Sequence, residues 1–546
     1  MQMKSSRPVR TVAEGTGQLR DYLAALLGDD GRLIVASNRG PLSFSQTRSG
    51  EWHAKRGSGG LVTALGELGR LAPVTWVSAA MDRDDRIAAE LLKGPPSDTQ
   101  AEILRAIAHE LPGQDIRLDL RPVAEEAWRS HYTQFANPFL WFMQHQLFTL
   151  HYEPTVDDAL INAWRRGYSV INDTLAQAVL RQTYTTQRRP VVLLQDYHLY
   201  LAAGEIRAER PDALLLHFNH IPWPSVDSWM MLPQGLRRGI CEGLLGNDIV
   251  GLQTDRYATN FLSSVAAFVR DAEVDPDGRH VRWRGRTIWV RAYPISIEPD
   301  SLAAFARSPA VERRRAELRA RLERAGSPRL IVRVDRLEPS KNALRGFIAF
   351  ENLLERRPEL RASVRFVAIQ SVSRADIADY AQYAGAVREV VARVNGLADP
   401  DAAPIWLLDG SDYDLAIAAL SLADVVLVNP VVDGMNLVAK EAAIVSRAAL
   451  VLSETAGAAE QLASDALMVS AADVSGTAAM LERGLDMPLG ERLVRIRRLR
   501  ASVREEDLQW WLTRQLRDLA AWSHGRRPPS RALRDTTREF EPALHG

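Results

Sequence analysis

RLIVRVDRLEPSK, residues 329–341, is the stretch that decides the fold of this chain. Its first part, RLIVRVD, is a β-rich apolar run without strict alternation, which is typical of a strand covered on both faces in a parallel sheet. Two cations, Arg336 and Lys341, follow the run, and open α/β sheets bind their ligands at this position. An Arg and a Lys on one loop can straddle a diphosphate, although solvated loop cations are the plainer alternative.

Similar apolar runs recur along the chain in two series. The predicted strands of the first series are Leu33–Ser37, Val74–Ala79, Val191–Asp196, Leu214–Asn219 and Asp248–Gln253. Those of the second series are Arg329–Asp335, Val364–Gln370, Ile405–Asp409, Asp424–Pro430 and Leu450–Glu454. Intervening segments such as Val311–Ala325 and Asn342–Arg356 are rich in helix formers. Strands that alternate with helices predict an α/β protein, and two series predict two doubly wound, Rossmann-like domains.

The chain has 546 residues, more than a single hydrophobic core supports, so we expect at least two domains. The break between them is predicted near Tyr293–Pro299 (YPISIEP), where two prolines flank a short run. The expected segments are an N-terminal extension at 1–30, a first domain at 31–295, a second domain at 296–484, a helical segment at 485–525 that returns to the first domain, and a loose tail at 526–546.

Composition excludes several classes of protein. A hydrophobic share of 46% with 25% charged residues is ordinary for a globular chain, and the formal net charge of zero argues against a nucleic-acid binder. The single cysteine, Cys241, rules out an intrachain disulfide and a cysteine-based zinc site. Neither a secretory signal nor an apolar run of membrane-spanning length is visible. We therefore expect a cytoplasmic enzyme with no membrane partner.

Polar loops follow other predicted strands. Gly57-Ser58-Gly59-Gly60 precedes an apolar helical pattern, so its amides would lie at a helix N-terminus and cradle a phosphate, unless the glycines only form a flexible turn. Neither a Walker motif nor GxGxxG is present, which disfavours kinase-like and dinucleotide-binding functions. His220 ends a strand, where a structural role is the common alternative. His217 and His220 would point to opposite faces of that strand, so we expect no metal.

A series of motifs in one order carries a family resemblance. The motifs are SNRGP (37–41), GSGGL (57–61), HYTQFANPFLW (131–141), DYHL (196–199), HIPWPS (220–225), GLQT (251–254), YPISIEP (293–299), VDRLEPSK (334–341), SRADI (373–377) and DGMNLVAKE (433–441). Together they resemble the trehalose-6-phosphate synthase family, which comprises retaining glycosyltransferases of GT-B fold and includes glucosylglycerol-phosphate synthases and pseudo-glycosyltransferases. The resemblance implies two Rossmann-like domains with the active site in the cleft between them.

The resemblance also implies roles for individual residues. The implied donor-binding residues are Gly59, Gly60, Arg336, Lys341, Asp433, Gly434, Met435, Asn436, Leu437 and Glu441. Among them, Arg336 and Lys341 hold the diphosphate, Asp433 the donor glucose and Glu441 the ribose. The implied acceptor-binding residues are Arg39, Trp76, Tyr132, Trp141 and Arg374, of which the two tryptophans line the pocket and the other three grip the phosphate. The implied catalytic residues are His220, Asp196, Arg336 and Lys341.

The reaction implied is transfer of glucose from a nucleoside-diphosphate-glucose to glucose 6-phosphate, which gives trehalose 6-phosphate. The donor is a substrate, so no cofactor is expected, and the two cations stabilise the leaving phosphates without a metal. Val432, Gln195 and Asn342 differ from the usual family pattern of Arg, His and Gly. Another phosphorylated acceptor, a catalytically silent regulatory subunit and a homo-oligomer stay open as alternatives. No phosphatase-like domain is visible after residue 480.

Overall fold

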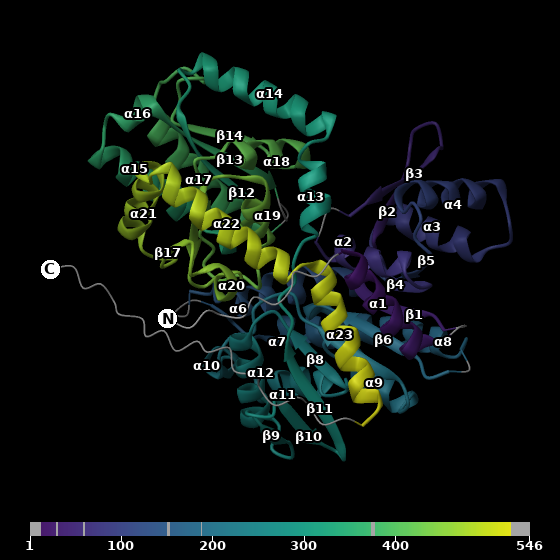
Figure 1. Ribbon diagram of the computed structural model, residues 1–546. Coiled ribbons are helices and arrows are strands. Elements are labelled where there is room, and N and C mark those ends of the chain that lie inside the picture. Colours follow the sequence, from purple (N-terminus) through teal and green to yellow (C-terminus); the bar gives the residue numbers. More distant parts are fainter. Residues whose placement is uncertain are drawn as a thin grey trace.

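The computed structural model describes residues 12–28, 31–57, 60–149, 153–186, 188–372 and 377–525 (Figure 1). It contains two α/β domains, each built on a largely or wholly parallel sheet with helices packed against it. A separate two-stranded ribbon, β2 (Leu42–Gln46) and β3 (Trp52–Arg56), extends from the first domain. The predicted fold class is therefore confirmed.

The first sheet has nine strands in the order β5-β4-β1-β6-β7-β8-β11-β10-β9. Its strands are β1 Leu33–Arg39, β4 Val74–Ala80, β5 Ile116–Pro122, β6 Val191–Gln195, β7 Leu214–Phe218, β8 Ile249–Leu252, β9 Glu273–Asp275, β10 His280–Trp283 and β11 Arg286–Ala292. Adjacent strands from β5 to β11 are parallel, and β10 and β9 are antiparallel. Because later strands add on the far side of β1, the order reverses between β1 and β6.

The second sheet has six parallel strands in the order β14-β13-β12-β15-β16-β17. Its strands are β12 Arg329–Leu337, β13 Val364–Val372, β14 Ile405–Asp409, β15 Val425–Val428, β16 Ala449–Ser453 and β17 Leu467–Val469. Numbered within this sheet, the order is 3-2-1-4-5-6, the Rossmann arrangement. The reversal lies between β12 and β15, and the first sheet repeats the same pattern.

Helices cover both sheets (Figure 1). Those up to the break are α1 Val12–Leu27, α2 Gly60–Gly66, η1 Glu67–Arg70, α3 Arg83–Lys93, α4 Asp98–Glu110, α5 Glu125–Arg129, η2 Ser130–Leu140, α6 Trp141–Gln144, α7 Asp158–Asn162, η3 Ala163–Tyr168, α8 Ser169–Thr183, η4 Tyr197–Leu199, α9 Ala202–Glu209, α10 Val226–Met230, α11 Gln234–Leu244 and α12 Asp255–Phe268. Those after it are α13 Pro299–Phe305, α14 Pro309–Arg324, η5 Pro339–Lys341, α15 Ala343–Arg356, α16 Leu360–Ser363, α17 Ala378–Asn395, α18 Tyr413–Leu422, α19 Leu437–Val445, α20 Ala459–Leu462, α21 Val474–Asp486, α22 Leu489–Glu505 and α23 Leu508–Ser523.

Every strand predicted from a continuous apolar run is present. The sequence reasoning missed β5, because IRLDLRP alternates polar and apolar residues at the edge of the sheet. It also missed β2, β3, β9, β10, β11 and β17. It also did not assign a helix to the N-terminal extension, where the structure has α1. The predicted loose tail at 526–546 lies outside the described residues.

The last helix returns to the first domain. Helix α23 packs against α1 and contacts β7 (Figure 1, yellow against purple). The indole Nε1 of Trp511 donates to the carbonyl oxygen of Tyr293 at 3.1 Å, and the Tyr293 hydroxyl donates to Asp518 Oδ2 at 2.9 Å. These buried bonds tie residues near the end of the described chain to the end of β11. In the described part of the chain, none of the helices has the length and apolarity to cross a membrane.

Candidate active site

The predicted site residues follow the strands at the two points where the strand order reverses. In the first sheet, Arg39 ends β1 and Asp196 follows β6. In the second sheet, Arg336 lies at the end of β12, and the 433–437 turn (DGMNL) follows β15. Crevices at such reversal points are where doubly wound sheets bind ligands. The sequence therefore placed its candidate residues at the ends that the topology favours.

Cations and carboxylates of the second domain form a paired cluster. Lys341 Nζ lies 2.6 Å from Asp433 Oδ2, and Arg336 Nη2 lies 3.1 Å from Glu338 Oε1. Burial alone would raise the pKa of Asp433, but Lys341 outweighs that effect, with help from His145, and holds this pKa below its ordinary value. Asp433 is therefore a carboxylate at neutral pH, and Lys341 is its counter-ion. The Arg336 side chain is 49% exposed, so it is accessible to an anion.

The 433–437 turn leads directly into α19. Asn436 caps this helix, because its side chain accepts a hydrogen bond from the Ala439 amide, and its Nδ2 donates to Asp433 Oδ2 at 3.1 Å. Asn436 has a φ of 83°, which Asn tolerates better than most residues. One residue thus orients Asp433 and starts a helix whose first amides and dipole favour an anion.

Two glycines let the domains approach each other closely. A Cβ atom at Gly434 would lie 2.0 Å from the carbonyl oxygen of His220, and one at Gly60 would lie 2.5 Å from Leu437 Cδ1. The Tyr257 hydroxyl also donates to the carbonyl oxygen of Asp433 at 2.8 Å across the same boundary. The donor-side turn therefore packs on the first domain at His220. Gly59, the other predicted glycine, lies outside the described residues.

Asp196 and His220 lie together just beyond the carboxyl ends of the adjacent strands β6 and β7. The His220 amide donates to Asp196 Oδ1 at 3.2 Å, and the ring Nε2 lies 3.0 Å from Gln195 Oε1. Burial lowers the pKa of His220 to about 3, so the imidazole is neutral at physiological pH. Asp196 has a φ of 71° and a ψ of 170°, a region that is nearly restricted to glycine and costs about 1–3 kcal/mol. Strained backbone of this kind accumulates at functional sites.

The acceptor-side motifs meet through two residues that the sequence reasoning did not single out. His131 Nε2 lies 3.0 Å from Asn38 Oδ1, and burial lowers the pKa of His131 to about 3. This neutral contact joins the end of β1 to η2. Arg39 directly follows Asn38 and Tyr132 directly follows His131, so the contact also brings the segments of these two predicted acceptor residues together. Tyr132 stacks on Trp128 with ring centroids 5.2 Å apart. Arg374 lies outside the described residues.

The two predicted acceptor tryptophans are buried. Trp76 has no exposed surface, and its Nε1 donates to Ser37 Oγ at 2.7 Å. It lies within the core on β4, so its predicted place on the wall of the acceptor pocket is not supported by this structure. Trp141 is also buried, with its ring centroid 4.0 Å from that of His145. Burial lowers the pKa of His145 to about 4, and Asp433 opposes this shift.

Glu441, on α19, is paired with Tyr413. Its Oε1 accepts a hydrogen bond from the Tyr413 hydroxyl at 2.9 Å, and Tyr413 stacks on Phe305 with centroids 5.4 Å apart. Burial raises the pKa of Glu441, while the hydroxyl partly offsets this shift. Of the remaining predicted donor residues, Met435 is buried and its carbonyl oxygen accepts from the Ala458 amide at 2.7 Å.

The three departures from the family pattern have different local consequences. Gln195 pairs with His220, as described above, and Val432 is buried beside Asp433. Asn342 has a φ of 60° and a ψ of 34°, the left-handed conformation that glycine also adopts. Its Nδ2 donates to the carbonyl oxygens of Asn429 at 2.9 Å and Ala471 at 2.7 Å. Its Oδ1 also accepts a hydrogen bond from Arg345 Nη1 at 3.0 Å, so Asn342 replaces glycine without losing the turn and adds three side-chain hydrogen bonds.

We expect Asn342→Ala to lower the free energy of unfolding by about 3 kcal/mol. About 1–2 kcal/mol comes from forcing alanine into the left-handed region, and about 1 kcal/mol from each of the two hydrogen bonds that Nδ2 donates to backbone carbonyl oxygens. Asn342→Gly loses only the hydrogen bonds, so it should be more stable than the alanine variant by about 1 kcal/mol. Denaturant unfolding of the three proteins measures the difference, and an alanine variant as stable as the glycine variant contradicts this interpretation.

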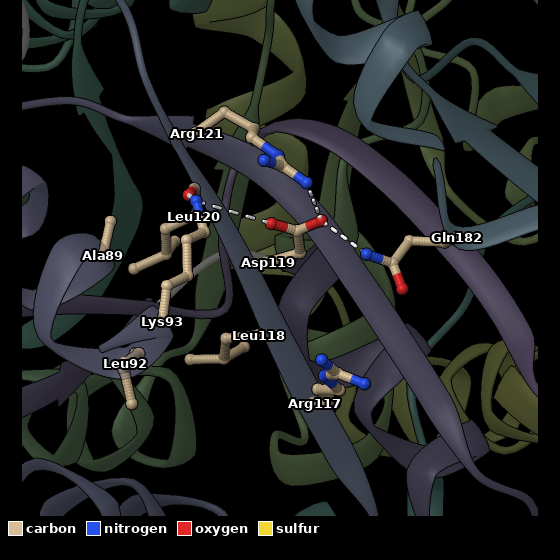
Figure 2. Close-up of a pocket in the computed structure, with 9 residues that line it drawn as sticks. All are labelled: Ala89, Leu92, Lys93, Arg117, Leu118, Asp119, Leu120, Arg121 and Gln182. Atoms are coloured by element: carbon tan, nitrogen blue, oxygen red, sulfur yellow. Dashed lines mark hydrogen bonds and ion pairs between the residues drawn. The ribbon is translucent and has the colours of Figure 1, made fainter. Parts of the chain in front are cut away.

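A surface pocket elsewhere in the first domain is separate from these residues. It has a volume of about 320 Å³ and lies on the edge strand β5, between α3 and α8. Figure 2 shows the residues that line it. Its buried Asp119 is already paired, because Oδ2 lies 2.7 Å from Arg121 Nη2 and 2.8 Å from Gln182 Nε2. Lys93 donates to the Leu120 carbonyl oxygen at 2.8 Å.

As for metals, no group of three or more His, Cys, Asp or Glu side chains within the described ranges is arranged to hold an ion.

Two doubly wound domains that meet at their strand-reversal points are the architecture of the GT-B glycosyltransferases. An E. coli structure described as trehalose-6-phosphate bound with UDP-2-fluoro glucose matches this chain with a TM-score of 0.74 and 27% identity, over 90% of this chain and 99% of that one. The model of glycosyltransferase family 20 matches residues 31–521, and the chain belongs to that family.

Two further relatives are similar over most of this chain. A solved α,α-trehalose-phosphate synthase (UDP-forming) from Burkholderia xenovorans, in complex with glucose-6-phosphate, matches with a TM-score of 0.72 and 27% identity, over 90% of this chain and all of that one. A bifunctional trehalose-6-phosphate synthase/phosphatase of Thermoproteus tenax is 33% identical over 92% of this chain. This chain spans 65% of the length of the T. tenax protein.

Proposed function

We propose that this chain is a retaining glucosyltransferase that moves glucose from UDP-glucose to glucose 6-phosphate and forms trehalose 6-phosphate. The observation that carries the proposal is the cluster of Arg336, Lys341 and Asp433 at a strand-reversal point, packed against His220 of the other domain. Membership of family 20 and the likeness to structures with a UDP-glucose analogue and glucose-6-phosphate support the same substrates.

The donor binds the second domain in this proposal, which we assign to residues 296–484. Arg336 and Lys341 hold the diphosphate, and the first amides of α19 add hydrogen bonds beside Gly434 and Leu437. Asp433 accepts hydrogen bonds from the glucose hydroxyls, and Glu441 accepts them from the ribose. As the glycosidic bond to phosphate breaks, negative charge grows on the leaving phosphates, and the two cations stabilise it.

The acceptor binds the first domain, which we assign to residues 31–295. Arg39 and Tyr132 bind its phosphate together with Arg374, which comes from the second domain. The hydroxyl that attacks the anomeric carbon lies on the same face as the leaving group. The leaving phosphate oxygen takes the proton of that hydroxyl. Asp196 and His220 orient the donor sugar, with His220 as a neutral imidazole. No step needs an enzymic nucleophile, a cofactor or a metal.

A donor-by-acceptor matrix tests this proposal. The purified chain, dialysed against a chelator, is given UDP-, ADP- and GDP-glucose with glucose 6-phosphate, glucose or glycerol 3-phosphate, and the product is identified by mass and linkage. We expect trehalose 6-phosphate from UDP-glucose and glucose 6-phosphate. If glycerol 3-phosphate is the only acceptor that gives a product, it takes the place of glucose 6-phosphate as the proposed acceptor. If no donor gives transfer, a silent regulatory subunit is favoured. Activity that returns only with a divalent ion would overturn the metal-free mechanism.

A further inference from the structure

Glu338 lies between the two cations of the donor loop and has no exposed surface. Its Oε1 is 3.1 Å from Arg336 Nη2, 3.1 Å from Ser340 Oγ and 3.9 Å from Lys341 Nζ. The backbone closes the same turn, because the Glu338 amide donates to the Arg336 carbonyl oxygen at 2.8 Å and the Lys341 amide donates to the Glu338 carbonyl oxygen at 3.1 Å. A single carboxylate oxygen therefore contacts the heads of both cations.

A neighbouring ion pair on β12 provides a contrast. Arg333 and Asp335 are paired, with side chains only 1% and 9% exposed, as expected for a pair that only stabilises the fold. At Glu338 only the carboxylate is buried, while the Arg336 side chain is 49% exposed. Burying an ion is unfavourable unless its partners are well placed. Here the buried carboxylate lies beneath one half-exposed cation, Arg336, and one that is mostly covered, Lys341, whose side chain is 15% exposed. This arrangement supports the positions of both cations.

We propose that Glu338 is a positioning residue, which holds Arg336 and Lys341 at the separation that the leaving diphosphate requires. This inference rests on the proposed function, because it assumes that the two cations bind that diphosphate. It differs from the role of Asp433, whose carboxylate contacts Lys341 but belongs to the sugar side of the site. Ser340 donates to the same oxygen and fixes the rotamer of Glu338 from within η5.

Loss of the carboxylate has two opposite effects. Removing a negative charge near the phosphate site strengthens the attraction for an anion, so binding of UDP should not weaken. Releasing the cations lets them move away from the transition-state geometry, and a displacement of about 1 Å can cost about 100-fold in rate. A positioning role therefore predicts that kcat and UDP affinity separate, whereas general damage to the site would lower both.

The test compares Glu338→Ala and Glu338→Gln with the parent chain. We expect Glu338→Ala to lower kcat about 100-fold at saturating UDP-glucose and glucose 6-phosphate, while calorimetry gives a Kd for UDP equal to or below the parent value. Glu338→Gln keeps an oxygen in place, so its kcat should stay within about tenfold of the parent, with UDP bound more tightly. Asp335→Ala is the matched control for loss of a nearby arginine-paired carboxylate, on β12, and its loss of kcat should be smaller than that of Glu338→Ala.

Each result decides the proposal. Parent-like kcat in Glu338→Ala, or a loss of UDP affinity in proportion to the loss of kcat, overturns it. If the alanine variant does not fold, the glutamine variant decides alone, because weaker UDP binding in that variant contradicts the charge argument. A parent chain that neither binds UDP nor transfers glucose overturns the proposed function, and this inference with it.

Discussion

Lys341→Ala and Arg336→Ala should each lower kcat about 100-fold at saturating donor. Each substitution removes one charged partner of the departing diphosphate in a preorganised site, and one such contact contributes about 3 kcal/mol to transition-state stabilisation. Lys341→Ala also leaves Asp433 without its ion-pair partner at 2.6 Å, so the pKa of Asp433 should rise towards the value that burial favours. We therefore expect this variant to lose more activity at acidic pH than at neutral pH, because the protonated carboxyl is a poorer acceptor for the sugar hydroxyls.

Steady-state kinetics with both substrates varied measures these losses. The matched control is Lys93→Ala, which removes a lysine at the pocket of Figure 2 and should leave kcat unchanged. Circular dichroism checks that the variants are folded. If both Lys341→Ala and Arg336→Ala turn over near the parent rate at saturating donor, the two cations do not bind the leaving group.

Trp511→Ala should destabilise the first domain by about 3–5 kcal/mol, the range for removing a large buried aromatic side chain. Trp511 has no exposed surface, packs edge-on against Phe218 with ring centroids 5.1 Å apart and donates to the Tyr293 carbonyl oxygen. Its loss leaves a cavity between α23 and β7 and an unpaired buried carbonyl group.

Two domains can unfold separately, so the measurement follows the first domain alone. Hydrogen exchange of the β6 and β7 amides, with increasing urea, reports its local stability. Trp510→Ala is the control on the same helix, because that side chain is only partly buried. A Trp511→Ala loss below about 1 kcal/mol would mean that α23 contributes little to the first domain.

Strands could be predicted where both faces of the sheet are covered, because such strands have continuous apolar runs. β12 and β6 are examples, whereas the edge strand β5 alternates and was missed. The order of the strands in each sheet could not be predicted from the apolar runs, since it depends on which edge of the sheet each new strand joins. The sequence nonetheless identified the ends of the central strands as the candidate site, because polar residues follow those runs directly.

The details of the site depend on side-chain directions that no local pattern encodes. Trp76 was expected at the acceptor pocket, yet its position on β4 directs the ring into the core. Glu338 and His131 were missed because their importance comes from contacts with Arg336 and Asn38. The left-handed backbone at Asn342 explains why an apparent departure from the family pattern fits the turn.

The return of α23 to the first domain has a consequence for synthesis of the protein on the ribosome. The surface formed by Phe218 and Tyr293 is translated long before Trp511, which covers it. At typical elongation rates, the residues between Tyr293 and Ser523 take roughly 10–50 seconds to emerge. During that interval the nascent first domain lacks its closing helix and exposes the apolar surface that Trp511 later covers, so we expect it to bind chaperones. Folding of this chain is therefore not strictly sequential, because the domain made first is completed last.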